Sequence, residues 1–179
     1  MAEPGALIRR AQPDDAESVA AIYAYHVAHG TASFDIAPRT GPEIAAKIAD
    51  CNARGWPFLV AVQDRRLVGY AYATQFRDRP AYASTCENSI YLDPTAIGQG
   101  LGALLLAALI EASERAGFRQ MIAVVGGAEP ASIALHRKLG FREAGRMTSV
   151  GRKQGRWLDT VYLQLTLGAG DTSPPTIEP

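Results

Sequence analysis

A glycine-rich turn in the middle of the chain has the residue types and spacing most suited to binding an anion. An apolar run at residues 85–92 comes first. Gly98, Gly100 and Gly102 follow it, and a helical pattern begins at Leu101. Glycines let the backbone approach a ligand closely, and the first amides of a helix are unpaired donors at its positive end. The sequence therefore predicts a site for phosphate-like groups at this turn.

Four interpretations of the turn can be compared on its residues alone. A dinucleotide site needs G-x-G-x-x-G in the first strand–helix–strand unit, whereas this chain has G-x-G-x-G near its middle. A Walker loop needs a Lys followed by Ser or Thr, and neither follows here. The turn either binds the pyrophosphate of coenzyme A or only packs a helix on a strand.

Glu87 is the carboxylate best placed for acid–base chemistry. It is the one charged residue of residues 81–92. Burial in such a strand raises the pKa of a carboxyl group towards the range of a useful base. The alternative is a Glu on the exposed side of a strand end.

A short basic segment, Arg77-Asp78-Arg79, lies between the aromatic residues Phe76 and Tyr82. Two arginines separated by one residue can hold a carboxylate or a phosphinate through charge-assisted hydrogen bonds. The alternative is a solvated basic loop.

Apolar periodicity predicts the elements that position these residues. Strands are expected at residues 7–10, 58–62, 67–73, 85–92, 121–125, 142–150 and 157–167. Helices are expected between an N-cap at Asp14-Asp15 and Gly30, from Pro42 to near Gly55, and at residues 101–116 and 130–138. The order is β-α-α-β-β-β-α-β-α-β-β.

The bulk composition fits one domain. The chain has 179 residues, and 18 basic residues balance 18 acidic ones. This balance argues against nucleic acid as a main partner, and the longest apolar stretch, 101–110, is too short to span a bilayer. Two cysteines without metal-ligand spacing and no signal peptide favour a cytoplasmic protein without a metal. The domain is expected at residues 1–167, and the Gly- and Pro-rich tail, 168–179, is expected to be disordered.

Several segments together resemble the GNAT superfamily of N-acetyltransferases, and within it the phosphinothricin and methionine-sulfoximine acetyltransferase family. They are residues 87–91, the glycine turn, 132–141 and 155–159. The resemblance extends from Ile8 to about Leu165. It implies a mixed α/β fold, with a central, largely antiparallel sheet that splays between residues 88–92 and 121–125. It also implies a homodimer.

The resemblance implies acetyl-CoA as cosubstrate, with its pyrophosphate on the amides of residues 98–102 and its pantetheine arm in the splay. The implied contacts are Ile90, Tyr91, Leu92, Ile97, Gly98, Gln99, Gly100, Leu101, Gly102, Glu129 and Ser132. Two of these depart from the family pattern. Ile97 stands where Gln or Arg is usual, and Glu129 stands where Asn is frequent.

By the same resemblance, Glu87 is the base that deprotonates the amine, directly or through water. His136 corresponds to the residue that protonates the departing sulfur. The alternative for His136 is a helix histidine satisfied by packing and a backbone carbonyl. Arg77 and Arg79 would hold the acidic part of the substrate, and Phe34 and Tyr82 would supply pocket walls.

The sequence thus predicts an N-acetyltransferase for a small amino acid or analogue, acting by direct transfer. A nicotinamide-dependent oxidoreductase is disfavoured by the glycine spacing. A non-catalytic acyl-CoA-binding module would not need Glu87 and His136. Protein N-termini, polyamines and aminoglycosides are other possible acceptors, but polycationic amines would prefer an acidic pocket.

Overall fold

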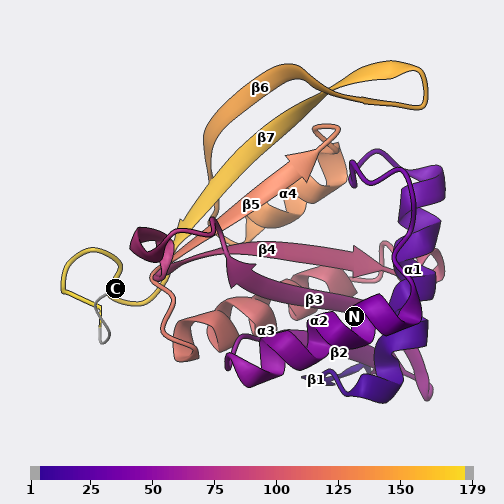
Figure 1. Ribbon diagram of the computed structural model, residues 1–179, viewed down its shortest axis with the longest axis horizontal. Coiled ribbons are helices and arrows are strands. Elements are labelled where there is room, and N and C mark those ends of the chain that lie inside the picture. Colours follow the sequence, from indigo (N-terminus) through magenta and orange to yellow (C-terminus); the bar gives the residue numbers. More distant parts are fainter. Residues whose placement is uncertain (1–4, 176–179) are drawn as a thin grey trace.

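The protein folds as a seven-stranded sheet with helices on both faces (Figure 1). The computed structural model describes residues 5–175. The strands are β1 (Leu7–Arg10), β2 (Phe58–Gln63), β3 (Arg66–Gln75), β4 (Thr85–Leu92), β5 (Gln120–Gly126), β6 (Arg142–Lys153) and β7 (Arg156–Thr166). The helices are α1 (Ala16–His29), α2 (Gly41–Ala53), α3 (Leu101–Arg115) and α4 (Pro130–Lys138). The predicted order of helices and strands is confirmed.

The strand order is β1-β2-β3-β4-β5-β7-β6. Only β4 and β5 pair in parallel, and every other neighbouring pair is antiparallel. The prediction of a mixed α/β fold with a largely antiparallel sheet is confirmed. Three short 3-10 turns were not predicted from the sequence. They are Pro13–Asp15, Pro80–Tyr82 and Pro94–Ala96, and each begins at a proline.

Alternation along the strands builds two cores. Phe58, Val60 and Tyr70 point to one face and pack with apolar residues of α1 and α2. Leu59 and Ala61 point to the other face and pack with α3. Successive strand residues face opposite sides, so the part of β2 that is buried on both faces, residues 58–61, is apolar.

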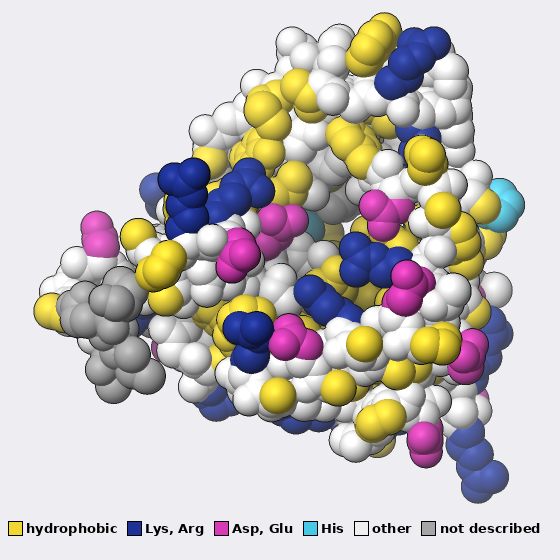
Figure 2. Space-filling model, viewed as in Figure 1, with side chains coloured by type: hydrophobic (Ala, Val, Ile, Leu, Met, Phe, Trp, Pro, Cys, Tyr) yellow, Lys and Arg dark blue, Asp and Glu magenta, His cyan; other side chains and the backbone are white. Residues whose placement is uncertain are grey.

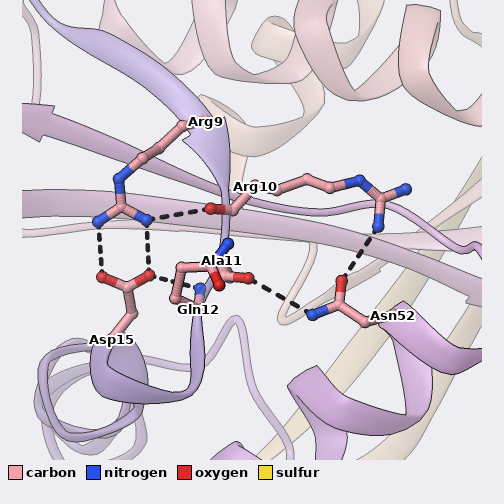
Figure 3. Close-up of polar contacts among 6 residues, drawn as sticks. All are labelled: Arg9, Arg10, Ala11, Gln12, Asp15 and Asn52. Carbon is pink, nitrogen blue, oxygen red and sulfur yellow. Dashed lines mark hydrogen bonds and ion pairs between the residues drawn. The ribbon is translucent and has the colours of Figure 1, made fainter.

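Asp15 is the N-cap residue of α1, as expected, but its side chain makes no capping hydrogen bond to that helix. The Asp15 carboxylate instead receives two hydrogen bonds from Arg9, at 2.7 and 2.8 Å, and one from the Gln12 amide at 2.7 Å (Figure 3). Asn52 donates to the Ala11 carbonyl, so these contacts fasten the end of β1 to the start of α1 and to α2. The bidentate pair with Arg9 competes successfully for the carboxylate because it carries charge on both sides.

The end of the chain has contacts of its own. Residues 168–171 form a turn, and Arg119 donates to the Pro174 carbonyl at 3.1 Å. Residues 176–179, the rest of the tail expected to be disordered, lie outside the described residues. Among residues 5–175, no helix is long and apolar enough to cross a membrane.

Candidate active site

The site lies where the two parallel strands separate. β4 and β5 are paired from Thr85 and Gln120 up to Asn88 and Ala123. β4 then runs on to Leu92 and β5 to Gly126 without pairing to each other. A cavity of about 240 Å³ occupies the separation. Its walls are Ala32, Ser33, Phe34, Glu87, Asn88, Ser89, Ile90, Tyr91, Ala123, Val124, Val125, Gly126, Ser132, His136 and Thr160.

Glu87 enters this cavity from the face of the sheet covered by α1 and α2. It is partly buried, and burial raises the pKa of its carboxyl group. The positive charges of Arg77 and Lys47 partly oppose this by lowering the pKa. A carboxylate with a raised pKa that opens onto a cavity is suited to accept a proton near neutral pH.

His136 meets the same cavity from the opposite face of the sheet. It is 2% exposed, and Phe141 packs edge-on against its ring. Nδ1 lies 2.8 Å from the Ser132 carbonyl oxygen, and Nε2 lies 3.1 Å from Oδ1 of Asn88. Both partners are oxygens that accept, so a neutral ring donates to one of them and protonation adds a donor for the other. Burial lowers the pKa of His136, so the protonated ring gives up its proton readily.

Phe34 forms one wall of the cavity, and two glycines that were not predicted as site residues make room for its ring. A side chain at Gly126 of β5 would lie 3.1 Å from its ring, and one at Gly151 of β6 would lie 2.3 Å from it. The buried Lys153 of β6 donates to the Ser33 carbonyl at 2.8 Å and fixes the same segment. The β6–β7 hairpin therefore positions the wall that Phe34 forms.

The glycine turn leads into α3, as expected. Gly98 and Gly100 both have φ of 82°, a left-handed conformation that favours glycine. Within residues 5–175, the backbone amides of residues 98–102 have no acceptor in the protein. Residues 98–100 are exposed, whereas Leu101 and Gly102 are buried, so the exposed part of the turn at the N-terminus of α3 is open to an anion.

The other residues expected at the cofactor occupy several environments. Ile90 and Tyr91 line the cavity, Leu92 packs on the core, and Leu101 is buried. Ile97 is 57% exposed. Gln99 donates to the Thr95 carbonyl at 2.9 Å, which closes its own turn.

Ser132 and Glu129 lie at the start of α4. Ser132 lines the cavity and holds His136 through its carbonyl. Glu129 accepts a hydrogen bond of 2.5 Å from the Thr31 hydroxyl and so ties α4 to the segment after α1. Glu129, one of the two residues that depart from the family pattern, thus has a hydrogen-bond partner inside the protein.

The basic segment lies outside the cavity wall. Arg77 and Arg79 are exposed, and the Arg77 guanidinium stacks 4.3 Å from the Phe76 ring, against which Tyr82 packs edge-on. The Gln75 amide donates to the carbonyls of both arginines, at 2.7 and 2.9 Å. Arg77 still lies close enough to lower the pKa of Glu87, whereas no such link joins Arg79 or Tyr82 to the cavity.

Four polar residues that line the cavity were not predicted from the sequence: Ser33, Asn88, Ser89 and Thr160. The alternation of β4 would have placed Ser89 on the face of Glu87, since the two are separated by one residue. Asn88 and Thr160 come from strands whose approach to His136 and to the splay is set by the tertiary fold. No local pattern marks them.

Comparisons with known proteins identify a family and several similar proteins. The model of the "Acetyltransferase (GNAT) family" matches residues 34–141. A phosphinothricin N-acetyltransferase of Alcaligenes faecalis is 48% identical over 169 residues, which cover 94% of this chain and 86% of that protein. An L-methionine sulfoximine/L-methionine sulfone acetyltransferase of Pseudomonas aeruginosa is 38% identical over 173 residues, with 94% and 99% covered. A crystal structure of a phosphinothricin acetyltransferase from Sinorhizobium meliloti in complex with AcCoA is 45% identical, with a TM-score of 0.93 and coverage of 96% and 93%.

Proposed function

The chain belongs to the GNAT acetyltransferase family, and we propose that it transfers the acetyl group of acetyl-CoA to the amino group of a small amino acid. One observation carries the proposal. The opening between β4 and β5 has unpaired amides of the α3 turn at one end and a carboxylate with a raised pKa at the other.

The cofactor end fits the chemistry of coenzyme A. The amides of residues 98–102 bind the pyrophosphate, and the positive end of α3 adds to the attraction. Residues 90–92 of β4 have lost their pairing to β5, so their edge groups are available to the amides of the pantetheine arm. Ser132 and His136 border the same opening from α4.

The chemical step is a direct transfer. Glu87 takes a proton from the acceptor ammonium, directly or through water. The freed amine forms a bond to the acetyl carbon, and the carbon–sulfur bond breaks. His136 gives a proton to the departing thiolate and regains one from solvent. No covalent bond to the protein forms in this sequence.

The acceptor end suits an amino acid. Phe34 supplies an apolar wall, and Arg77, with Arg79 and Tyr82 behind it on the β3–β4 connection, holds the α-carboxylate. Bidentate pairing of a carboxylate by an arginine contributes about 1.5–3 kcal/mol, or roughly ten- to hundredfold in binding.

The test is thiol release from acetyl-CoA with a panel of free amino acids and their methyl esters. We expect the free acids to be good substrates and the esters to be poor ones. Arg77→Ala and Arg79→Ala should raise KM for the acid and leave KM for acetyl-CoA nearly unchanged. Equal use of acid and ester by the wild type would contradict the proposal and direct the search to peptide or polyamine acceptors.

We also propose that the chain forms a homodimer in the cytoplasm and that residues 1–167 form its catalytic domain. Residues 142–150 of the edge strand β6 are exposed along their whole length, and the neighbouring Trp157 is 63% exposed. Such an edge has unpaired backbone groups and apolar side chains on which a second chain can pack. Two free, buried cysteines suit a reducing compartment. Sedimentation velocity should give twice the monomer mass.

A further inference from the structure

Thr160 is a buried polar residue of the cavity that the proposed chemical step does not use. It lies on β7, is 4% exposed, and lines the cavity between β4 and β5. Figure 2 shows the molecule hollowed near its centre, with hydrophobic side chains on the side of the hollow toward β6 and β7. A hydroxyl in such surroundings needs a partner, because burying a polar group without a hydrogen bond costs free energy.

The register of the sheet places Thr160 on the same face as Glu87. Glu87 is paired with Ile122 of β5. Thr160 is paired with Gly126, further along the same strand. Paired residues share a face, and so do alternate residues of one strand, so Glu87 and Thr160 point to the same side. Since His136 meets the cavity from the opposite face, Thr160 belongs to the acceptor side.

The surroundings of Thr160 on that face are mostly apolar. A side chain at its register partner Gly126 would lie 3.1 Å from the Phe34 ring, so this ring packs over the end of β5 beside Thr160. Val124 precedes Gly126 by two positions, faces the same side and also lines the cavity. The Thr160 hydroxyl thus adds a polar group to an apolar corner.

The other buried polar side chains of the cavity wall have partners inside the protein. The Ser33 hydroxyl is 2.9 Å from the Tyr23 hydroxyl. The Asn88 side-chain oxygen is 3.1 Å from Nε2 of His136. These contacts hold the wall together, so they leave those groups less free to recognise a ligand.

The Thr160 hydroxyl differs, because it has no hydrogen-bond partner among residues 5–175. It is also not sealed inside the protein. Within the same residues, Ser113 Oγ is the one buried, unpaired side-chain oxygen or nitrogen that is closed off completely. The hydroxyl of Thr160 therefore opens onto the cavity that it lines, where a ligand can supply its partner.

We propose that the Thr160 hydroxyl forms a hydrogen bond with an uncharged polar atom on the side chain of the acceptor. This inference rests on the proposed function, because it assumes that the acceptor amine lies at Glu87. A hydroxyl both donates and accepts and carries no charge, so it recognises hydrogen-bonding capacity and not charge. An acceptor that lacks such an atom leaves the hydroxyl unpaired, and the site discriminates against it. Thr160 is thus a specificity residue of this chain.

Two acceptors of the same shape test this role. Methionine sulfone ends in a methylsulfonyl group, and in its carbon analogue a tert-butyl group takes that place. The analogue keeps the size of the side chain and loses both oxygens. The measurement is kcat/KM for both compounds with the wild type, Thr160→Val and Thr160→Ser. Thr166→Val is the matched control, because Thr166 lies on the same strand, is exposed, and donates to Gln120 at 3.4 Å outside the cavity.

We expect the wild type to prefer methionine sulfone. Thr160→Val keeps the shape of the residue and removes the hydroxyl, so it should reduce the ratio of the two kcat/KM values about tenfold, mainly through KM for the sulfone. Thr160→Ser keeps the hydroxyl and should restore most of the ratio, and the ratio for Thr166→Val should match that of the wild type. The KM for acetyl-CoA should stay the same in all variants. Turnover of the carbon analogue shows that a variant is folded.

The outcomes separate the two proposals. If the wild type acetylates neither compound nor any other free amino acid, the proposed function fails. If Thr160→Val changes both compounds equally, the hydroxyl does not contact the acceptor, and Thr160 only packs in its strand. A higher KM for acetyl-CoA in Thr160→Val would assign the hydroxyl to the cofactor and overturn the inference. A wild type that acetylates amino acids without preferring the sulfone to its analogue also overturns it.

Discussion

The two ends of the catalytic opening are built in different ways. In the proposed function, the cofactor end uses backbone amides from one continuous segment, residues 98–102. The proposed acceptor end uses side chains from β4, the β3–β4 connection and the segment around Phe34, which β6 holds in place. A backbone site tolerates side-chain changes but depends on chain conformation, whereas a side-chain site depends on residue identity. Substitutions should therefore act on the two ends in distinct ways.

The largest effect is expected at the acceptor end, from Glu87→Gln. Loss of the base should lower kcat about a hundredfold or more at neutral pH. The deficit should shrink as pH rises, because the amine then loses its proton without help. The check is the pH dependence of kcat for wild type and variant. An unchanged profile would mean that Glu87 is not the base.

At the cofactor end, Gly100→Ala tests dependence on backbone conformation. Gly100 has φ of 82° and open space around it, so an added methyl group meets no neighbour but strains the turn. The cost of about 1–2 kcal/mol should move the amides and raise KM for acetyl-CoA roughly tenfold.

The matched control is Gly117→Ala, at the other end of α3. Gly117 has φ of 94° and is equally open. The Gly117→Ala variant should lose a similar amount of stability in thermal unfolding, but its KM for acetyl-CoA should equal that of the wild type. Equal KM values for the two variants would show that the Gly100 turn does not hold the cofactor.

Asn88→Ala should have a smaller effect, because it acts on His136 rather than on a reacting atom. Loss of the 3.1 Å contact to Nε2 removes about 1 kcal/mol of positioning and should lower kcat about fivefold with KM little changed. Asn52→Ala removes an equivalent amide far from the site and should leave kcat intact. The idea fails if both variants have the kcat of the wild type.

The smallest effect concerns the pKa of Glu87. Burial raises this pKa, and the Arg77 charge lowers it, with a weaker contribution from Lys47. Because the deprotonated carboxylate is the active base, kcat/KM should fall as pH drops through this pKa. Arg77→Met removes the opposing charge, so the acid limb should move to higher pH, further than with Lys47→Met. Arg54→Met, a more distant cation near the end of α2, should leave it in place. A shift to lower pH would contradict this electrostatic account.

Local patterns in the sequence specify the parts of this protein that depend on neighbouring residues. Alternation and helical spacing gave the element order, and the glycine spacing located the turn at residues 98–102, since left-handed backbone there requires glycine. The GNAT fold and family could also be predicted, because each segment that carries the resemblance is continuous in the sequence, and both were confirmed.

Contacts between distant segments were decided only by the tertiary structure. The Asp15 carboxylate turned to Arg9 because β1 brings a guanidinium within reach, which helix-capping rules do not include. Asn88 meets His136, Gly151 meets Phe34, and Lys47 approaches Glu87 across 40 to 117 positions of sequence. Such contacts have no local signature, because their energies depend on where the sheet places each strand and helix. The sequence by itself thus determined the glycine turn and the fold that carries it, and the packing of separate elements determined the cavity between β4 and β5.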